Sequence, residues 1–137
     1  MSNATVYLTR KEHFSSAHQL QNAELSPEEN LRIFDKCMNV HGHNYILKIT
    51  IKGVPDSQTG MLMNITDFKR IILEKVLNHL DHKFIDKDVQ YFHEIPSTCE
   101  NLCIWIWYQI KEYLPQNVSL HRVKLRETEN NYAEFYG

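Results

Sequence analysis

The chain has 137 residues, of which 42% are hydrophobic and 23% are charged. These proportions are typical of a soluble globular protein and exclude an intrinsically disordered chain. A chain of this length buries about two thirds of its unfolded surface, so we expect a single domain over residues 1–137. The formal net charge of −2 excludes a general basic field that would hold nucleic acid or anionic lipid.

The sequence also bears on location and redox state. The apolar runs are far shorter than the ~20 residues of a membrane-spanning helix. The first 14 residues carry charges where a signal peptide needs an apolar stretch, so we expect a cytoplasmic protein. Three cysteines cannot all pair within one chain, and free thiols are predicted for Cys37, Cys99 and Cys103.

In the first half of the chain, residues 5–20 and 41–54 are predicted to be extended strands. Residues 21–36 form an excursion between them, and Ser26-Pro27-Glu28-Glu29 resembles the start of a short helix. Residues 55–60 are rich in turn formers and predict a turn.

In the second half, apolar side chains at helical spacing predict an amphipathic helix over residues 68–80. A second helix is predicted from Ser97 to about residue 113, with Ser97 as its N-cap and Glu100 reaching back to it. Two closing strands are predicted at residues 118–127 and 132–136.

This order of elements indicates an α+β domain, in which a four-stranded antiparallel sheet carries two helices on one face. Trp105, Trp107 and Tyr108 nearly encircle the second helix. That distribution favours an oligomer, because a helix with apolar side chains all round needs partners on every side.

His41-Gly42-His43 is the most informative spacing in the chain. In a strand, residues i and i+2 point the same way, so both imidazoles project from one face, and Gly42 leaves room between them. His18 joins them if the first two strands pair. Three histidines without a fourth protein ligand are typical of a catalytic zinc site. The alternative is ordinary half-buried histidines, but burying uncoordinated imidazoles is costly, which favours a metal.

Two further sets of residues are candidates for proton transfer. A nearby metal or cation such as Lys36 would favour the thiolate form of Cys37, although most free cysteines are small buried apolar residues. In Asp81-His82, a histidine with a carboxylate partner can act as a general acid or base. The alternative for this pair is a solvated helix end.

Glu127 ends an apolar strand face that also carries Val123 and Leu125. Its two oxygens suit a flat ligand with adjacent ring N–H and amino donors. The alternative is a residue at the strand end that turns to solvent.

From about residue 7 to 136, the chain resembles the 6-pyruvoyltetrahydropterin synthase family. Seven motifs occur in the family's order, which is a specific match. They are Phe14-Ser-Ser-Ala-His18, Glu29-Asn-Leu with Lys36-Cys37, His41-Gly-His-Asn-Tyr45, Gly60-Met-Leu-Met-Asn-Ile-Thr-Asp67, Leu80-Asp-His-Lys83, Ser97-Thr-Cys-Glu-Asn101 and Arg126-Glu-Thr-Glu-Asn130.

The resemblance implies the tunnelling fold, whose sheets join across subunits into a barrel, as a homohexamer of two trimers. It implies a zinc-dependent lyase that converts 7,8-dihydroneopterin triphosphate to 6-pyruvoyltetrahydropterin and triphosphate, in tetrahydrobiopterin biosynthesis. By position, the family's roles fall on zinc ligands His18, His41 and His43, proton acceptor Cys37, its partners Asp81 and His82 from across a subunit boundary, pterin anchor Glu127 and pterin contact Thr98.

Two departures from the family pattern bear on function. Cys99 stands where a second threonine is common beside Thr98. Only three residues separate Cys37 from His41, as in the bacterial 6-carboxytetrahydropterin synthases of the queuosine route, which release acetaldehyde from the same substrate. Against that alternative, residues 25–30 and 63–67 resemble the pyruvoyl enzymes.

Two other classes of function stay open from the residues alone. One is a zinc-dependent hydrolase in which the thiol is incidental, and the other is a non-catalytic zinc-stabilised binding module. The sequence does not rank the cations that would hold the triphosphate, which are Arg10, Lys11, Lys83 and Lys87.

Overall fold

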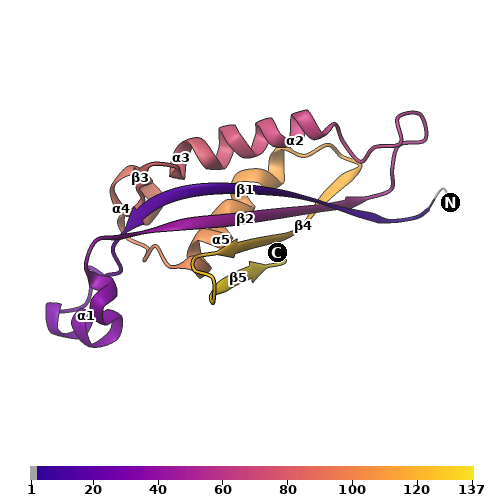
Figure 1. Cartoon of the computed structure of the whole chain (residues 1–137). Coiled ribbons are helices and arrows are strands. Elements are labelled where there is room, and N and C mark those ends of the chain that lie inside the picture. Colours follow the sequence, from indigo (N-terminus) through magenta and orange to yellow (C-terminus); the bar gives the residue numbers. More distant parts are fainter. Residues whose placement is uncertain (1–2) are drawn as a thin grey trace.

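The structure is a computed structural model that describes residues 3–137. Its five strands form one sheet in the order β3-β1-β2-β4-β5, and the long helical segments, residues 65–80 and 99–110, pack on one face of it (Figure 1). The strands are β1 (Val6–His18), β2 (His41–Gly53), β3 (Lys83–Phe84), β4 (Val118–Arg126) and β5 (Tyr132–Phe135). The predicted α+β class with helices on one face is confirmed.

The two longest strands, β1 and β2, form an antiparallel ribbon along their whole lengths, from Val6 opposite Gly53 to His18 opposite His41. β4 pairs with β2 only from Ile46 onward. The ribbon therefore extends beyond β4 at the end that carries the histidines.

The prediction of a four-stranded antiparallel sheet is wrong. A fifth strand, β3, pairs in parallel with β1 through Ser16–Lys83 and Ala17–Phe84. Two residues are too few for the alternation that identifies a strand in a sequence. β3 matters for the site because it fixes the preceding Asp81-His82 segment against β1.

The first long helical segment consists of α2 (Ile65–Ile72), a π-helical turn over Leu73–Leu77, and α3 (Asn78–Leu80). It begins three residues before the predicted start. Asn64 caps it, because its side chain accepts a 2.8 Å hydrogen bond from the Thr66 amide. Ile65 is exposed, so it does not extend the apolar stripe that defined the predicted helix.

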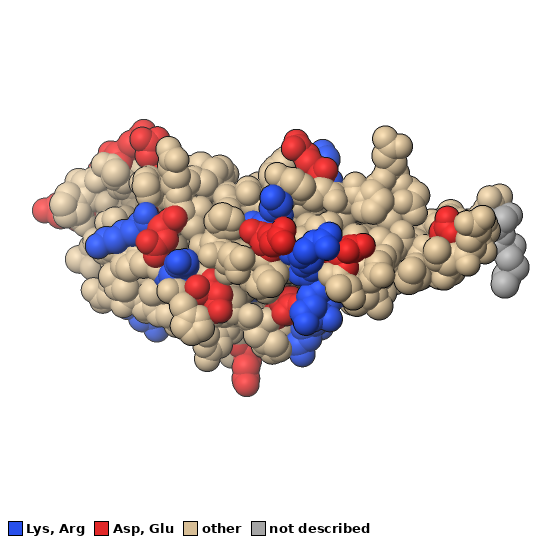
Figure 2. Space-filling view, turned by 90° about the horizontal axis from the view of Figure 1, so that it is seen from above, with Lys and Arg blue, Asp and Glu red and all other residues tan. Residues whose placement is uncertain are grey.

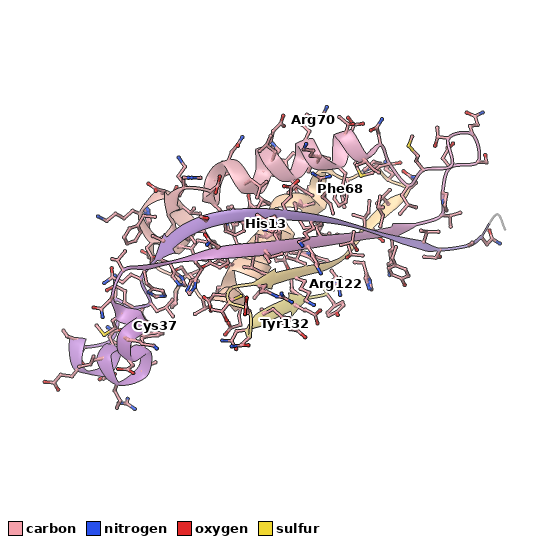
Figure 3. All side chains as sticks on the ribbon, viewed as in Figure 1. His13, Cys37, Phe68, Arg70, Arg122 and Tyr132 are labelled. Carbon is pink, nitrogen blue, oxygen red and sulfur yellow. The ribbon has the colours of Figure 1, made fainter. Side chains whose placement is uncertain are left out.

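The excursion between β1 and β2 contains α1 (Pro27–Phe34), as predicted from the Ser26-Pro27 signal. The hydroxyl of Ser26 accepts a hydrogen bond from the Glu29 amide at 3.1 Å. A 3-10 turn over Asp35–Met38 follows. α1 lies beyond the end of the β1–β2 ribbon (Figure 1), and Figure 3 shows Cys37 between α1 and β2.

The second long helix, α5 (Cys99–Ile110), continues as a 3-10 turn over Lys111–Tyr113. Its N-cap is Thr98, whose Oγ1 accepts a 3.2 Å hydrogen bond from the Asn101 amide, so the predicted cap at Ser97 is wrong. Ser97 is fully buried, and its hydroxyl donates to Asp86 instead. The cap therefore moves one residue along the chain.

The core lies between the sheet and the helices. The inward residues of β2, from Tyr45 to Ile51, and Leu102, Ile106 and Ile110 of α5 have no exposed area. Trp105 and Trp107 are also buried within the protomer, at 7% and 6% exposure. Their burial does not require a second subunit, whereas Tyr108 of the same helix is 58% exposed, so only that part of the aromatic surface is left uncovered.

The face seen from above α2 and α3 carries interspersed acidic and basic side chains (Figure 2). This mixture agrees with the small net charge of −2. No helix within residues 3–137 has the length and apolar character that crossing a membrane requires.

Replacing a core leucine of β2 tests this packing. Leu47 has no exposed area, so Leu47→Ala is expected to lower the free energy of unfolding by about 2–5 kcal/mol through lost burial and a cavity. Leu31 of α1 is 59% exposed, and Leu31→Ala is expected to change the free energy of unfolding by less than about 0.5 kcal/mol. Urea denaturation measures both, and equal losses would contradict the assigned core.

Candidate metal centre and active site

Three histidines meet at the free end of the β1–β2 ribbon. Strand register places His18 directly opposite His41, and Ser16 opposite His43. The ring centroids are 4.5 Å apart for His18 and His41, 5.1 Å for His18 and His43, and 5.0 Å for His41 and His43. One ligand atom from each ring lies within 4.8 Å of the other two. The rings that the sequence predicts to meet therefore do meet.

Backbone carbonyls orient two of the three rings. Nδ1 of His18 lies 2.7 Å from the carbonyl oxygen of Ser97, and Nδ1 of His41 lies 2.7 Å from that of Asn39. Nδ1 must carry the proton to donate to a carbonyl, so Nε2 keeps its lone pair. This arrangement is common for histidines that ligate metals.

The Nε2 atom of His18 is the strongest sign that the cluster fits a metal ion. It is buried and has no hydrogen-bond partner among residues 3–137. A buried polar atom without a partner costs about 1–3 kcal/mol. A divalent ion held by His18, His41 and His43 would use its lone pair.

Burial also favours the protonation state that ligands need. It lowers the pKa of His18, and the neighbouring His41 and His43 lower it further. Burial likewise lowers the pKa of His43, although the Glu127 carboxylate acts in the opposite direction. Both shifts favour neutral imidazole, which is the form that binds a metal.

Glu127 follows β4 and lies beside the histidines. Its Oε1 is 3.5 Å from Nε2 of His43 and 3.7 Å from Nε2 of His18. Its amide donates to the carbonyl of Asn131 at 3.0 Å, which closes the hairpin between β4 and β5. The carboxylate therefore points into the site and does not turn to solvent.

Cys37 shares a cavity of about 450 Å³ with two of the histidines and with Glu127. Lys36 lines the same cavity. The full lining is Leu20, Lys36, Cys37, His41, His43, Glu127, Thr128 and Asn131. One chain thus brings together the predicted metal ligands, proton acceptor and pterin anchor.

Asp81 and His82 form an oriented pair in the turn before β3. Oδ2 of Asp81 is 2.9 Å from Nδ1 of His82. The Ser15 amide donates to Oδ1 of Asp81 at 2.9 Å and, with His82, holds the pKa of that carboxyl below its usual range. His82 has a φ of 60°, fixed by a 2.7 Å hydrogen bond from its amide to the Ser15 carbonyl. Its side chain is 85% exposed.

Within one chain, this pair does not share the cavity of Cys37. His82 lines a separate cavity of about 470 Å³, together with Lys83, Ser15 and Asn44. His43 lines both cavities. The metal cluster therefore stands between the thiol and the Asp81-His82 pair.

Thr98 lies at the start of α5, where its hydroxyl oxygen caps the helix. The next residue, Cys99, lines a third cavity of about 380 Å³ with Glu127 and Tyr132. Burial raises the pKa of the Cys99 thiol to about 12, so it is a neutral side chain there.

Sequence analysis did not identify three residues that contribute to the site. Asn39 and Ser97 act through backbone carbonyls, which leave no mark in a sequence, and Asp86 acts only through Ser97 and Gln19. Lys36 lines the cavity but was not among the cations predicted for the triphosphate.

Comparison with known proteins identifies similar chains. A family model described as 6-pyruvoyl tetrahydropterin synthase matches residues 7–137. The 6-pyruvoyl tetrahydrobiopterin synthase of Dictyostelium discoideum is 49% identical over 97% of this chain and 97% of its own length. The structure of Caenorhabditis elegans 6-pyruvoyl tetrahydropterin synthase superposes with a TM-score of 0.93 at 34% identity, covering 100% of this chain and 99% of that one. A putative 6-carboxy-5,6,7,8-tetrahydropterin synthase of Archaeoglobus fulgidus is 35% identical over 72% of this chain and 77% of its own length.

Removing one imidazole tests the metal centre. His41→Ala is expected to weaken zinc binding by more than the roughly 10–100-fold that loss of an outer partner costs, because a direct ligand is gone. His13 lies on β1 but is exposed, so His13→Ala serves as the control. Titration against a chromophoric chelator measures both affinities. Unaltered zinc affinity in His41→Ala would rule out this site.

Proposed function

Because this chain belongs to the 6-pyruvoyl tetrahydropterin synthase family, we propose that it converts 7,8-dihydroneopterin triphosphate to 6-pyruvoyltetrahydropterin with release of triphosphate. The reaction is a carbon–oxygen lyase step on the path to tetrahydrobiopterin. The observation that carries the proposal is that a thiol, a carboxylate and two imidazoles line one cavity of about 450 Å³, and that His18 lies behind them within reach of the same metal ion.

His18, His41 and His43 would hold a zinc ion, since three neutral imidazoles with an open fourth position are typical of catalytic zinc. When bound, the zinc polarises the side-chain hydroxyls of the substrate and acidifies the neighbouring C–H and O–H bonds. The unpartnered Nε2 of His18 supports this assignment.

Cys37 accepts the proton from the substrate side chain at its Sγ. Cys37 lines the cavity together with His41, His43 and Glu127, which supports this role. Glu127 anchors the pterin ring, because its two oxygens can accept from the ring N–H and the amino group together. Thr98 lies next to Cys99 at the neighbouring cavity and supplies a further polar contact.

His82, oriented by Asp81, relays protons in an internal redox step, in which a side-chain carbinol is oxidised to a ketone as the pterin ring is reduced, and in the elimination that releases triphosphate. The Asp81 carboxylate fixes Nδ1 of His82 at 2.9 Å and leaves Nε2 available. We assign this pair to an active site shared with a neighbouring subunit. Its 85% exposed imidazole and its separation from the Cys37 cavity support that assignment.

The sheet also supports assembly into a barrel, as a homohexamer of two trimers. β3 covers only Ser16 and Ala17 on the outer edge of β1, and β5 forms the opposite edge of the sheet within residues 3–137. Uncovered edges present N–H and C=O groups that can pair with another chain. Edge-to-edge pairing that closes on itself produces a ring. Sedimentation of the purified chain tests this state.

The 6-carboxytetrahydropterin synthase activity is the second candidate, favoured by the short spacing between Cys37 and His41. Incubation with 7,8-dihydroneopterin triphosphate and zinc separates the two activities. We expect 6-pyruvoyltetrahydropterin and triphosphate, detected by chromatography and mass spectrometry. Acetaldehyde with a carboxypterin would replace the first candidate by the second, and no turnover would overturn both.

Cys37→Ala tests the proton acceptor. We expect turnover to fall on the order of 10²–10⁴-fold, the usual range for losing a general base, while zinc content stays unchanged. Cys103 is buried away from the cavity, so Cys103→Ala is the thiol control. Steady-state kinetics and metal analysis measure both. Full activity in Cys37→Ala would instead favour a hydrolase with an incidental thiol.

Glu127→Ala tests the pterin anchor. Loss of a charge-assisted, two-point contact is expected to weaken pterin binding by about 1.5–3 kcal/mol, roughly 10–100-fold, without releasing zinc. Glu129 lies in the exposed hairpin turn and provides the matched control, Glu129→Ala. Fluorescence titration with a dihydropterin measures binding. Unchanged affinity would remove the anchor role, and zinc loss would place Glu127 among the metal ligands.

A further inference from the structure

Asp86, in the short helix α4 (Ile85–Asp88), connects to His18 through one intervening residue. We propose that Asp86 is a positioning residue for the metal centre, which holds the His18 ring in place through Ser97 and Gln19. This inference rests on the proposed zinc site and adds a residue that touches neither metal nor substrate.

One oxygen atom of Asp86, Oδ1, accepts two hydrogen bonds that position the side chain and the backbone of His18. Nδ1 of His18 donates to the carbonyl of Ser97 at 2.7 Å, and the hydroxyl of Ser97 donates to Oδ1 of Asp86 at 2.9 Å. The amide of Gln19, the residue after His18, donates to the same Oδ1 at 3.0 Å. The imidazole and its backbone are therefore tied to one carboxylate.

The segment before α5 needs this carboxylate to keep its carbonyl aimed at His18. Asn101 holds the two residues beside Ser97, donating from Nδ2 to the Pro96 carbonyl at 2.9 Å and from its amide to Thr98 Oγ1 at 3.2 Å. Ser97 itself is fully buried, and its hydroxyl reaches Asp86. Without Asp86, a buried hydroxyl and a backbone amide both lose their acceptor.

His41 provides an internal contrast. Its Nδ1 is held by the carbonyl of Asn39, only two residues away in the chain. The carbonyl that holds His18 lies 79 residues away, so tertiary structure must bring it there. The His18 ring consequently depends on α4 and the start of α5, whereas the His41 ring depends on the residues just before its own strand.

This arrangement gives Asp86 a defined role in metal affinity. A hydrogen bond to the second nitrogen fixes the tautomer and orientation of a ligating histidine and raises its basicity, and loss of such a partner typically costs 10–100-fold in affinity. Thr98 adjoins Ser97, so the same contact also steadies the start of α5 beside the proposed pterin site.

The experiment compares variants of two aspartates on α4. Asp86→Ala removes the acceptor, Asp86→Asn keeps one acceptor oxygen, and Asp88→Ala removes a carboxylate that accepts from the Phe84 amide at 2.8 Å but contacts no ligand. Zinc affinity is measured on the full chain by chelator competition, and the visible spectrum of the Co²⁺-loaded protein reports ligand geometry. Thermal unfolding of each metal-free variant measures its fold separately.

We expect Asp86→Ala to bind zinc 10–100-fold more weakly with an altered Co²⁺ spectrum, Asp86→Asn to fall between it and the wild type, and Asp88→Ala to match the wild type. Equal zinc affinity in Asp86→Ala and wild type would overturn the inference. So would an equal loss of affinity in Asp88→Ala, because the effect would then be general destabilisation of α4. A wild-type chain that binds neither zinc nor Co²⁺ would instead refute the metal centre itself.

Discussion

The antiparallel register of β1 on β2 is the constraint on which the site depends. His18 stands opposite His41 at the last pair of the ribbon, and His43 follows two residues along the same strand. A slip of one residue would send the inward side chains of a strand to the opposite face. The inward side chains of β2, at alternate positions from Tyr45 to Ile51, prevent that slip, because they have no exposed area in this register. Core packing thus sets the metal-ligand geometry.

Burial within the cluster of three histidines also destabilises the fold when no metal ion is bound. His18 is fully buried and its pKa is lowered, while its Nε2 atom has no hydrogen-bond partner among residues 3–137. In the metal-free chain, this unpartnered atom therefore lowers the free energy of unfolding, and coordination of a metal ion would remove that loss. A metal bound here stabilises the fold and prepares the cavity by the same contacts.

Features with a local signature in the sequence were predictable, and features set by tertiary contacts were not. The spacing of His41 and His43 specifies one strand face, and Ser26-Pro27 specifies the start of α1. β3 has only two residues and no alternation. Ser97 has the character of a helix cap, yet it is buried and bonds to Asp86, which only the packing of α4 on the start of α5 determines. Every residue has a backbone carbonyl, so the sequence alone does not show which carbonyl orients an imidazole.

The position of His43 bears on the proposal that two subunits share each active site. His43 faces the Cys37 cavity and also the cavity of His82, so the two proton-transfer groups lie in different cavities. His82 adopts a left-handed backbone conformation, which is costly for a residue with a Cβ, and the hydrogen bond to Ser15 maintains it. Within one chain, the oriented imidazole of His82 is 85% exposed and does not line the cavity of the thiol. In the proposed assembly, a second copy would bring its own thiol and histidine cluster against that imidazole, and the reacting centre would then lie at a contact between subunits.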